Sequence, residues 1–369
     1  MVALDRKFLR DFDWELLLAA LMLITFGIIE IHSAEPQMEY WKKQLFWSII
    51  ALFVMLTVAL IDYRKLHKLS PYYYIAIITC LVLVLIIGKK VNGQRAWINL
   101  GAFDFQPSQM ARMASILVLA RMFGAPRKGP LSMREIVTAC LLVGLPVGLI
   151  MLQPDAGMAL TFVPVLAALL FFSGIDRKLV IYAVLLVAVS IPLGYYATVQ
   201  KGLFLKPYQI ERIQSVIHPE LADRRGFGYQ TYQSMIAVGS GGLFGKGIGK
   251  STQGRLGFIP ERHNDFIAAV ASEETGFIGS IMLLLVYLFI LLRCIQTAQL
   301  ARDRFGTLAI LGFVAVVFFH IMCNVGMVVG FLPVMGITLP LMSYGGSSLL
   351  ETAMGIGFVM SVRLRRFVN

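Results

Sequence analysis

The sequence has few charged residues, and this shortage excludes most classes of soluble protein. Only 15% of its 369 residues are Asp, Glu, Lys or Arg, whereas a soluble globular domain contains roughly 25%. Apolar residues make up 58% of the chain, and its mean hydropathy is +0.75. One soluble core could not enclose so much apolar surface, and a disordered chain would not contain it. The composition predicts an all-α polytopic integral membrane protein.

The sequence also lacks clustered cysteines and a cleavable leader. Its cysteines, Cys80, Cys140, Cys294 and Cys323, lie in or beside apolar runs, so we expect small buried side chains rather than a metal site. The first apolar run begins at Trp14 without a cleavage site after it, which predicts a retained span. The net charge of +12 is scattered through the links between apolar runs. This pattern is typical of membrane topology and not of nucleic-acid binding.

Ten apolar runs are candidates for transmembrane helices, which need about 20 residues each. They cover residues 14–32, 45–61, 72–88, 108–123, 136–152, 157–174, 179–198, 265–292, 307–329 and 346–362. The loops on the side of the N-terminus contain 18 Lys and Arg residues, against five in the short loops on the other side. Because cytoplasmic loops are rich in these residues, we expect both termini in the cytoplasm. The large loop 199–264, between spans seven and eight, is then extracytoplasmic.

The outer loop contains a glycine-rich stretch, Gly239–Thr252. Phe244 stands where a nucleotide-binding P-loop needs its first glycine, so we exclude nucleotide binding. Two interpretations stay open. The backbone N–H groups, with Lys246 and Lys250, bind a phosphate or pyrophosphate, or the glycines only form turns. The preceding segment, Gly228–Val238, has helical spacing of apolar residues and predicts a helix at the membrane interface.

Asp265 stands at the start of the eighth span, directly after Arg262, His263 and Asn264. One interpretation is structural, because Asn and Asp are preferred helix N-caps. The other is catalytic. A carboxylate at the boundary between water and membrane can take a proton from a sugar hydroxyl.

Five more polar residues lie deeper in the predicted spans: Glu273, Glu274, His320, Asn324 and Glu351. Ionisable groups at membrane depth often mark functional sites or proton paths, and polar side chains between helices also hold helices together. We expect a packing role for His320 and Asn324. For one of the two adjacent glutamates we expect a side chain that faces the lumen.

Three proline-containing loops, 89–109, 153–157 and 330–346, face the same side as the large loop. Irregular backbone persists at membrane depth only where it lines a cavity. We therefore expect an outward-facing cavity whose cations and carboxylates suit an anionic, hydroxyl-bearing substrate attached to a lipid. The residues expected around it are Arg95, Arg112, Asp155, Lys246, Arg262 and Asp265.

The motifs resemble those of the SEDS proteins (shape, elongation, division and sporulation), the RodA/FtsW/SpoVE family. Residues 324–348, NVGMVVGFLPVMGITLPLMSYGGSS, and 260–279, PERHNDFIAAVASEETGFIG, carry most of the resemblance. Three shorter stretches, IAVGSGGLFGKG, QPDAG and FQPSQ, support it in family order. The compact length is more similar to RodA than to FtsW. Where the family usually has Glu and then Lys, this chain has Gln109 and Arg112, so a carboxylate is absent at the first position.

The resemblance implies a peptidoglycan glycosyltransferase of the bacterial cytoplasmic (inner) membrane. Such an enzyme polymerises lipid II into β-1,4 glycan strands with inversion, during cell elongation and rod-shape maintenance. By this analogy Asp265 is the general base, and Arg112, Lys246 and Arg262 stabilise the undecaprenyl-pyrophosphate leaving group. The full set of expected substrate-binding residues is Arg95, Trp97, Gln109, Arg112, Asp155, Lys246, Glu261, Arg262, His263, Ser343, Gly345 and Gly346.

The resemblance also implies partners: lipid II, membrane lipids and a class B penicillin-binding protein that crosslinks the product, with no nucleic acid. No cofactor is required, although a divalent cation, Mg²⁺ or Mn²⁺, is an alternative way to neutralise the leaving group. A lipid II flippase is the competing function, since Glu273, Glu274 and Glu351 also fit a proton path. A non-catalytic scaffold for division proteins is the third.

Overall fold

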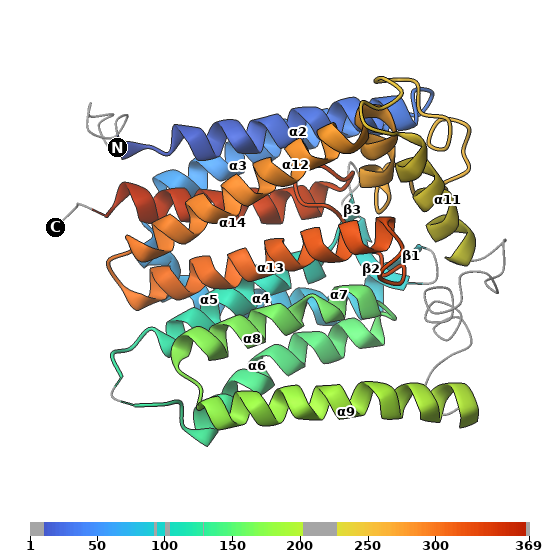
Figure 1. The fold of residues 1–369 in the computed structure, drawn as a ribbon. Helices are drawn as coiled ribbons and strands as arrows, with labels where there is room; N and C mark the ends of the chain where they lie inside the picture. The colour runs from blue at the N-terminus through green and yellow to red at the C-terminus, as the bar shows by residue number, and fades with distance from the viewer. Residues whose placement is uncertain (1–10, 92–93, 100–103, 128, 202–226, 367–369) are drawn as a thin grey trace.

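The structure, a computed structural model, describes residues 11–91, 94–99, 104–127, 129–201 and 227–366. Within these ranges the chain is a bundle of long helices, and α2 begins at the same end of the bundle as α14 ends (Figure 1). The helices are α2 (Trp14–Ala34), α3 (Tyr40–Leu60), α4 (Tyr63–Ile87), α5 (Pro107–Phe123), α6 (Met133–Leu152), α7 (Ala156–Leu160), α8 (Phe162–Ser173), α9 (Arg177–Lys201), α11 (Phe227–Ser240), α12 (Ile267–Gln299), α13 (Arg304–Val328) and α14 (Gly346–Leu364). Residues 202–226 of the expected outer loop lie outside the described part.

Each of the ten predicted ranges overlaps a long helix, or, for 157–174, the pair α7 and α8. The mostly helical membrane fold predicted from composition is confirmed. Among the residues that the structure describes, seven helical segments are long and apolar enough to cross a membrane by length and composition. The number of crossings therefore stays a prediction. The helix expected over 228–238 is α11, which packs against α12 and α13 at one end of the bundle.

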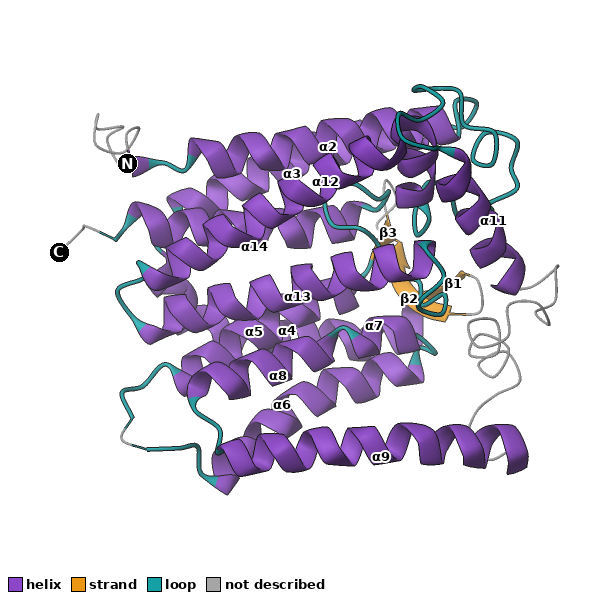
Figure 2. Cartoon of the chain, in the orientation of Figure 1, coloured by secondary structure: helices purple, strands orange, loops and turns teal. Residues whose placement is uncertain are grey.

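A small sheet at the same end as α11 is a feature that the sequence did not lead us to expect (Figure 2). It has the antiparallel order β1 (Lys89–Val91), β2 (Gln94–Asn99), β3 (Asp104–Phe105), and it occupies the expected irregular loop 89–109. The burial of side chains along β2 is consistent with a strand, since Ala96 is fully buried between exposed or half-buried neighbours. A strand with one buried side chain and polar flanks gives little signal in a sequence dominated by long apolar runs.

The centre of the bundle is formed by α5 with α13 and α14. Nearly all of α5 is buried, because α4, α8, α13 and α14 surround it. This enclosure lets a helix with several polar residues lie at membrane depth, since its polar groups meet protein partners and not lipid. α14 packs most extensively against α3, and a buried glycine, Gly357, lies against the backbone of Met55 at their contact.

The expected single span 265–292 is corrected by the structure. α12 is two helical segments joined at Gly276, whose φ of 71° and ψ of −166° break the helix. At 1.5 Å per residue, its 33 residues would be about 50 Å long, well beyond the roughly 30 Å of a bilayer core. Only the segment after Gly276 therefore has the length of one crossing, and Glu273 and Glu274 lie at the break.

The backbone groups freed by this break are bonded by the glycine-rich loop. The N–H of Phe277 donates to the carbonyl of Gly242 (2.9 Å), and the N–H of Lys246 donates to the carbonyl of Glu273 (3.0 Å). The approach is so close that a Cβ atom at Gly276 would lie 2.3 Å from the backbone nitrogen of Gly245. Glycine is therefore required at this position both for its conformation and for space.

Candidate functional site

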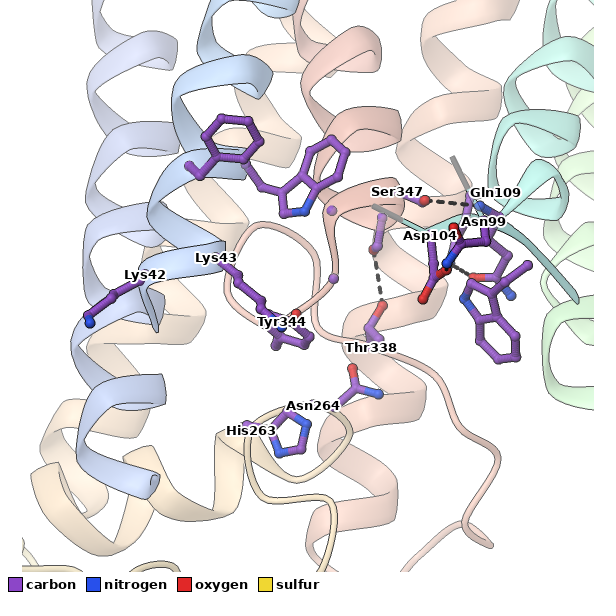
Figure 3. Close-up of a pocket in the computed structure, with 17 residues that line it drawn as sticks. Lys42, Lys43, Asn99, Asp104, Gln109, His263, Asn264, Thr338, Tyr344 and Ser347 are labelled. Atoms are coloured by element: carbon purple, nitrogen blue, oxygen red, sulfur yellow. Dashed lines mark hydrogen bonds between the residues drawn. The ribbon is translucent and has the colours of Figure 1, made fainter. Parts of the chain in front are cut away.

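A cavity of about 680 Å³ lies at the end of the bundle where the sheet is found, opposite the end where α2 begins and α14 ends. Its walls come from α3, the sheet, the start of α5, residues 263–264 and the loop that leads into α14 (Figure 3). The lining residues are Lys42, Lys43, Phe46, Trp47, Trp97, Asn99, Asp104, Gln106, Gln109, His263, Asn264, Thr338, Tyr344, Gly345, Gly346, Ser347 and Ser348. Hydroxyls, amides, cations and aromatic rings thus share one opening, which is the chemistry of a site for a sugar-containing anion.

Backbone clamps hold the loops of this cavity in place. The N–H of Tyr344 donates to the carbonyl of His263 (3.0 Å), and the hydroxyl of Ser343 donates to the carbonyl of Asn264 (2.8 Å). From α3, the amide of Gln44 donates to the carbonyl of Ser343 and accepts from the N–H of Gly345, both at 3.2 Å. Segments far apart in sequence are therefore fixed relative to one another before any ligand binds.

Aromatic rings orient His263 within the wall. Its imidazole stacks on Tyr40 with ring centroids 4.3 Å apart, and Tyr344 meets both rings edge-on. The Nδ1 atom of His263 lies 3.1 Å from Oε1 of Glu35. Burial, with the nearby Tyr40 and Asp104, raises the pKa of Tyr344, so its hydroxyl stays a neutral hydrogen-bonding group.

Asp265 lies beside the cavity, and not in the lining itself. The preceding residue, Asn264, lines the cavity, and the Asp265 side chain is 8% exposed. A Cβ atom at Gly336 would lie 3.7 Å from Oδ2 of Asp265, and the amide of Asn324 donates to the Asp265 carbonyl (2.8 Å). The N-cap of α12 is Phe266, and that residue makes no side-chain cap. The proposed capping role of Asn264 or Asp265 is therefore not what the structure shows.

The expected packing role of Asn324 agrees with its contacts. Its amide also donates to the carbonyl of Ile337 (2.8 Å), so it joins the segment before α12 to the loop before α14. Both carbonyls are buried near the cavity, where an unbonded one would be unfavourable.

Five of the expected substrate-binding residues line the cavity. They are Trp97, Gln109, His263, Gly345 and Gly346. The remaining seven are not among its lining residues. Of the six charged residues expected around the cavity, Asp265 directly follows a lining residue, and the other five are not in the lining. In the structure these five bind partners within the protein.

Arg112 lies behind the cavity wall, with only 1% of its side chain exposed. Its guanidinium contacts Glu351, His320 and the side-chain oxygen of Gln109, with Nε 3.0 Å from Oε1 of Glu351. Since Gln109 lines the cavity, Arg112 acts on the site through it and does not face a ligand. His320 also lies 3.0 Å from the carbonyl of Thr338, so its packing role is observed.

The glycine-rich loop binds carboxylates of its own chain. Lys246 donates to Oε1 of Glu273 (2.6 Å), and the N–H groups of Thr252 and Gln253 donate to the same carboxylate (2.9–3.2 Å). The N–H groups of Gly249 and Ser251 donate to Glu274. Both glutamates are almost fully buried. Of the two interpretations of this loop, these bonds favour glycines that form turns over a phosphate site. The carboxylates of Glu273 and Glu274 bond to this loop, whereas we expected one of them to face the lumen.

The other expected residues serve local structure. Arg262 lies 3.2 Å from Glu35 and donates to the Ala34 carbonyl, and Arg95 is exposed on β2. Asp155 caps α7 by accepting from the N–H of Met158 (3.1 Å). The carbonyl of Glu261 accepts from the N–H groups of Asn264 and Phe266. The hydroxyl of Ser343 accepts from the N–H of Leu339 and donates to the carbonyl of Asn264, so it joins the two loops.

Sequence reasoning missed the contribution of α3. Lys42 and Lys43 were counted only as topology charges, although two lysines separated by two residues from Phe46 and Trp47 are a combined cationic and aromatic signal. Ser347 and Ser348 were present in a quoted motif and were not singled out. Among the described residues, no group of three or more His, Cys, Asp or Glu side chains could hold a metal ion.

Comparison with known proteins gives a consistent family. Residues 12–366 match the sequence model of the FtsW/RodA/SpoVE family, described as cell cycle protein. The chain is 37% identical over 355 residues to peptidoglycan glycosyltransferase MrdB of Escherichia coli K12, covering 96% of this chain and 94% of the relative. It is 35% identical over 362 residues to stage V sporulation protein E of Bacillus subtilis 168, covering 95% and 96%.

Solved structures agree with these sequence relatives. A chain of a peptidoglycan synthase complex, studied for the coordination of polymerisation and crosslinking, matches with a TM-score of 0.82 and 30% identity, covering 97% of this chain and 99% of that one. The rod shape determining protein RodA of Thermus thermophilus matches with a TM-score of 0.72 and 29% identity, covering 97% and 98%.

Proposed function

The chain belongs to the FtsW/RodA/SpoVE family and is a peptidoglycan glycosyltransferase, and we propose that it polymerises lipid II at the cavity described above with Asp265 as the general base. The relatives named peptidoglycan glycosyltransferase favour this enzyme over a flippase or a scaffold. The expected family and activity are thus confirmed, and the residue roles are our proposal.

One observation supports Asp265 more than any other. Asp265 directly follows Asn264, which lines the cavity, while the N-cap position of α12 belongs to Phe266. A helix cap would have accounted for an aspartate at this point without any chemistry. The clamp from Asn324 also fixes the Asp265 backbone against the loop before α14, which is the rigidity that a general base needs.

The reaction can be written on these groups. Asp265 takes the proton of the acceptor GlcNAc 4-hydroxyl as its oxygen attacks the donor anomeric carbon from the face opposite the pyrophosphate. The new β-1,4 bond forms as the bond from carbon to phosphate oxygen breaks, and undecaprenyl pyrophosphate leaves with the electron pair. Attack from the opposite face inverts the α-linked donor. Hydroxyls and aromatic rings of the cavity, with Trp97, His263 and Tyr344 among them, would hold the sugars.

Partner, orientation and cellular role follow as part of this proposal. The relatives include a chain of a synthase complex that coordinates polymerisation and crosslinking, which supports a class B penicillin-binding protein as partner. The positive-inside bias of the loops supports cytoplasmic termini, and the cavity would then open on the outer side. Similarity to MrdB and RodA supports a role in elongation and rod shape.

A divalent cation, Mg²⁺ or Mn²⁺, remains part of the proposal as an auxiliary. Such ions bind readily to pyrophosphate oxygens together with one or two carboxylates. The nearby Asp265 fits that limited contribution, whereas Asp104, in the cavity lining, already binds Asn99 (2.9 Å). Bound there, the ion would neutralise charge on the leaving group.

The proposal is tested by comparing the two carboxylates at the site in purified protein supplied with lipid II. Asp265→Asn should lower glycan synthesis by about 100-fold or more, the scale expected for loss of a general base. Asp104→Asn should keep most activity, because Asp104 already binds Asn99 (2.9 Å). A gel of labelled products measures both variants in detergent without a membrane gradient. Full activity of Asp265→Asn, or loss only in Asp104→Asn, would refute the assignment.

A further inference from the structure

Two adjacent lysines at the start of α3 differ in their surroundings. Lys42 donates to Oε1 of Glu39 (2.7 Å) in an exposed pair, and this hydrogen bond lowers the pKa of Glu39. Both residues line the cavity, and Figure 3 shows the Lys43 side chain directed toward Tyr344 and the Lys42 side chain directed the opposite way. Lys43 forms no side-chain hydrogen bond or ion pair with any residue that the structure describes.

Several other cations of the described part of the chain already have carboxylate partners. The ion pairs are Arg112 with Glu351, Lys246 with Glu273, Arg262 with Glu35, and Lys89 with Asp104. Lys43 therefore offers an anion in the cavity an ammonium group that forms no ion pair with another described residue. Glu39 is the nearby carboxylate that also interacts with Lys43, but it is already paired with Lys42. A cation that forms no close ion pair at the wall of a polar cavity favours an anionic ligand.

The wall that Lys43 faces consists of hydrogen-bonding groups. α14 begins there at Gly346, followed by Ser347 and Ser348, and the hydroxyl of Ser348 lies 3.1 Å from that of Thr338 (Figure 3). The first backbone N–H groups of a long helix attract anions through the helix dipole. Hydroxyl donors, a helix start and a lysine are the combination found around bound phosphate groups.

The outer face of α3 fits the lipid part of such a ligand. Phe46, Ile49 and Phe53 follow at intervals of three and four residues and are 56–71% exposed. Residues with this spacing lie on one side of a helix. A phosphate group at Lys43 would therefore leave its polyprenyl chain beside a continuous apolar strip that runs down from the cavity.

We propose that Lys43, facing Ser347 and Ser348 across the cavity, binds the pyrophosphate of the lipid-linked substrate and stabilises it as it leaves. This proposal deepens the glycosyltransferase function and rests on it. As the bond to the anomeric carbon breaks, the phosphate oxygen gains the electron pair, and the ammonium of Lys43 balances that charge while keeping its proton. The cations predicted for this task from the sequence, Arg112, Lys246 and Arg262, are bonded to carboxylates in the structure.

Binding without turnover tests the proposal, because undecaprenyl pyrophosphate carries no sugar and cannot be polymerised. Full-length protein in detergent is titrated with this lipid, with undecaprenol and with phosphatidylglycerol. Lys43→Gln should weaken binding of undecaprenyl pyrophosphate about tenfold, the effect of one lost charge-assisted hydrogen bond. Lys42→Gln, the matched control at a lining residue that is already paired with Glu39, should weaken it much less, and Lys43→Arg should restore part of it. Undecaprenol and phosphatidylglycerol should bind both glutamine variants as they bind the parent protein.

Three results would overturn the proposal. One is equal binding of undecaprenyl pyrophosphate to Lys43→Gln and to Lys42→Gln. The second is an equal loss for undecaprenol, which would show that Lys43 supports the fold or the lipid face. The third is an equal loss for phosphatidylglycerol, which would indicate a general site for anionic lipids. Since no step here uses Asp265, failure of this binding test and an active Asp265→Asn variant are separate outcomes.

Discussion

The ammonium of Lys246 lies 2.6 Å from Oε1 of Glu273, a carboxylate without exposed surface, and this contact closes the glycine-rich loop over the break in α12. Around it, hydroxyl and N–H groups from residues 251–253 donate to the same carboxylate. The loop and the helix break therefore depend on each other. Removal of either partner leaves a buried charge or several buried donors unbonded, which is more damaging than removal of an exposed charge.

We expect Lys246→Gln to lower the free energy of unfolding by about 1–2 kcal/mol, a value reduced from the buried-pair range because Lys246 is 28% exposed. Lys250→Gln, in the same loop but exposed, should change it by less than about 0.5 kcal/mol. Thermal unfolding in detergent compares the two variants, and limited proteolysis shows whether residues 239–253 open. Equal stability of both variants would mean that the ion pair does not hold the loop.

The helices could be predicted from the sequence because long apolar runs are strong local signals. The break at Gly276 could not, since SEETGFIG reads as continuous helix until the loop that bonds its freed carbonyls is known. The sheet from Lys89 to Phe105 was missed because its strands are short and only partly apolar.

The sequence predicted some residues of the candidate site, but it could not show which charged residues are paired with one another. Motifs identified Trp97, His263 and the Gly345–Gly346 pair near the cavity. They could not show which cations already have counter-ions, because pairs such as Arg112–Glu351 join residues 239 positions apart. The loops thus predicted a polar cavity, but the sequence could not show that the charged residues named around it have partners elsewhere, and Lys43 was not singled out for the same reason.

The buried pair of Arg112 and Glu351 allows a test that separates stability from activity. Arg112→Leu alone should destabilise the protein by about 3–5 kcal/mol, because it leaves Glu351 buried without its partner. Replacing both residues by Leu should recover most of that loss. Glycan synthesis should stay low in the double variant, since Gln109 in the cavity wall loses its bond to Arg112. Thermal unfolding and product gels measure the two effects, and full activity of the double variant would rule out a positioning role.

Glu35 is expected to act on the substrate through His263, whose Nδ1 it contacts at 3.1 Å. Glu35→Ala should raise the KM for lipid II several-fold and change kcat less, because the imidazole lines the cavity and would lose its fixed orientation. Glu35→Gln should restore much of the affinity, since its amide oxygen can still accept a hydrogen bond. Glu39→Ala is the matched control on the same loop, exposed and paired with Lys42. Steady-state kinetics with lipid II measure KM and kcat for these variants. Identical KM values for Glu35→Ala and Glu39→Ala would contradict a role of Glu35 in orienting His263.

Trp47 and Gly346 provide the most local test of the cavity wall. A Cβ atom at Gly346 would lie 2.3 Å from Cε2 of Trp47, so Gly346→Ala must push the indole or the start of α14 into the cavity. We expect glycan synthesis to fall by about 10–100-fold, because displacements near 1 Å have effects of this size at enzyme sites. Overpacking should also lower the free energy of unfolding by about 1–3 kcal/mol.

Gly144→Ala on α6, where a Cβ meets nothing within 4 Å, should leave synthesis and stability unchanged. Adding Trp47→Leu to Gly346→Ala should recover stability, because it removes the ring that the new methyl group meets. If Gly346→Ala were as stable and active as the parent protein, the indole would not be seated on the first residue of α14, and the shape of the site that faces Lys43 would be different.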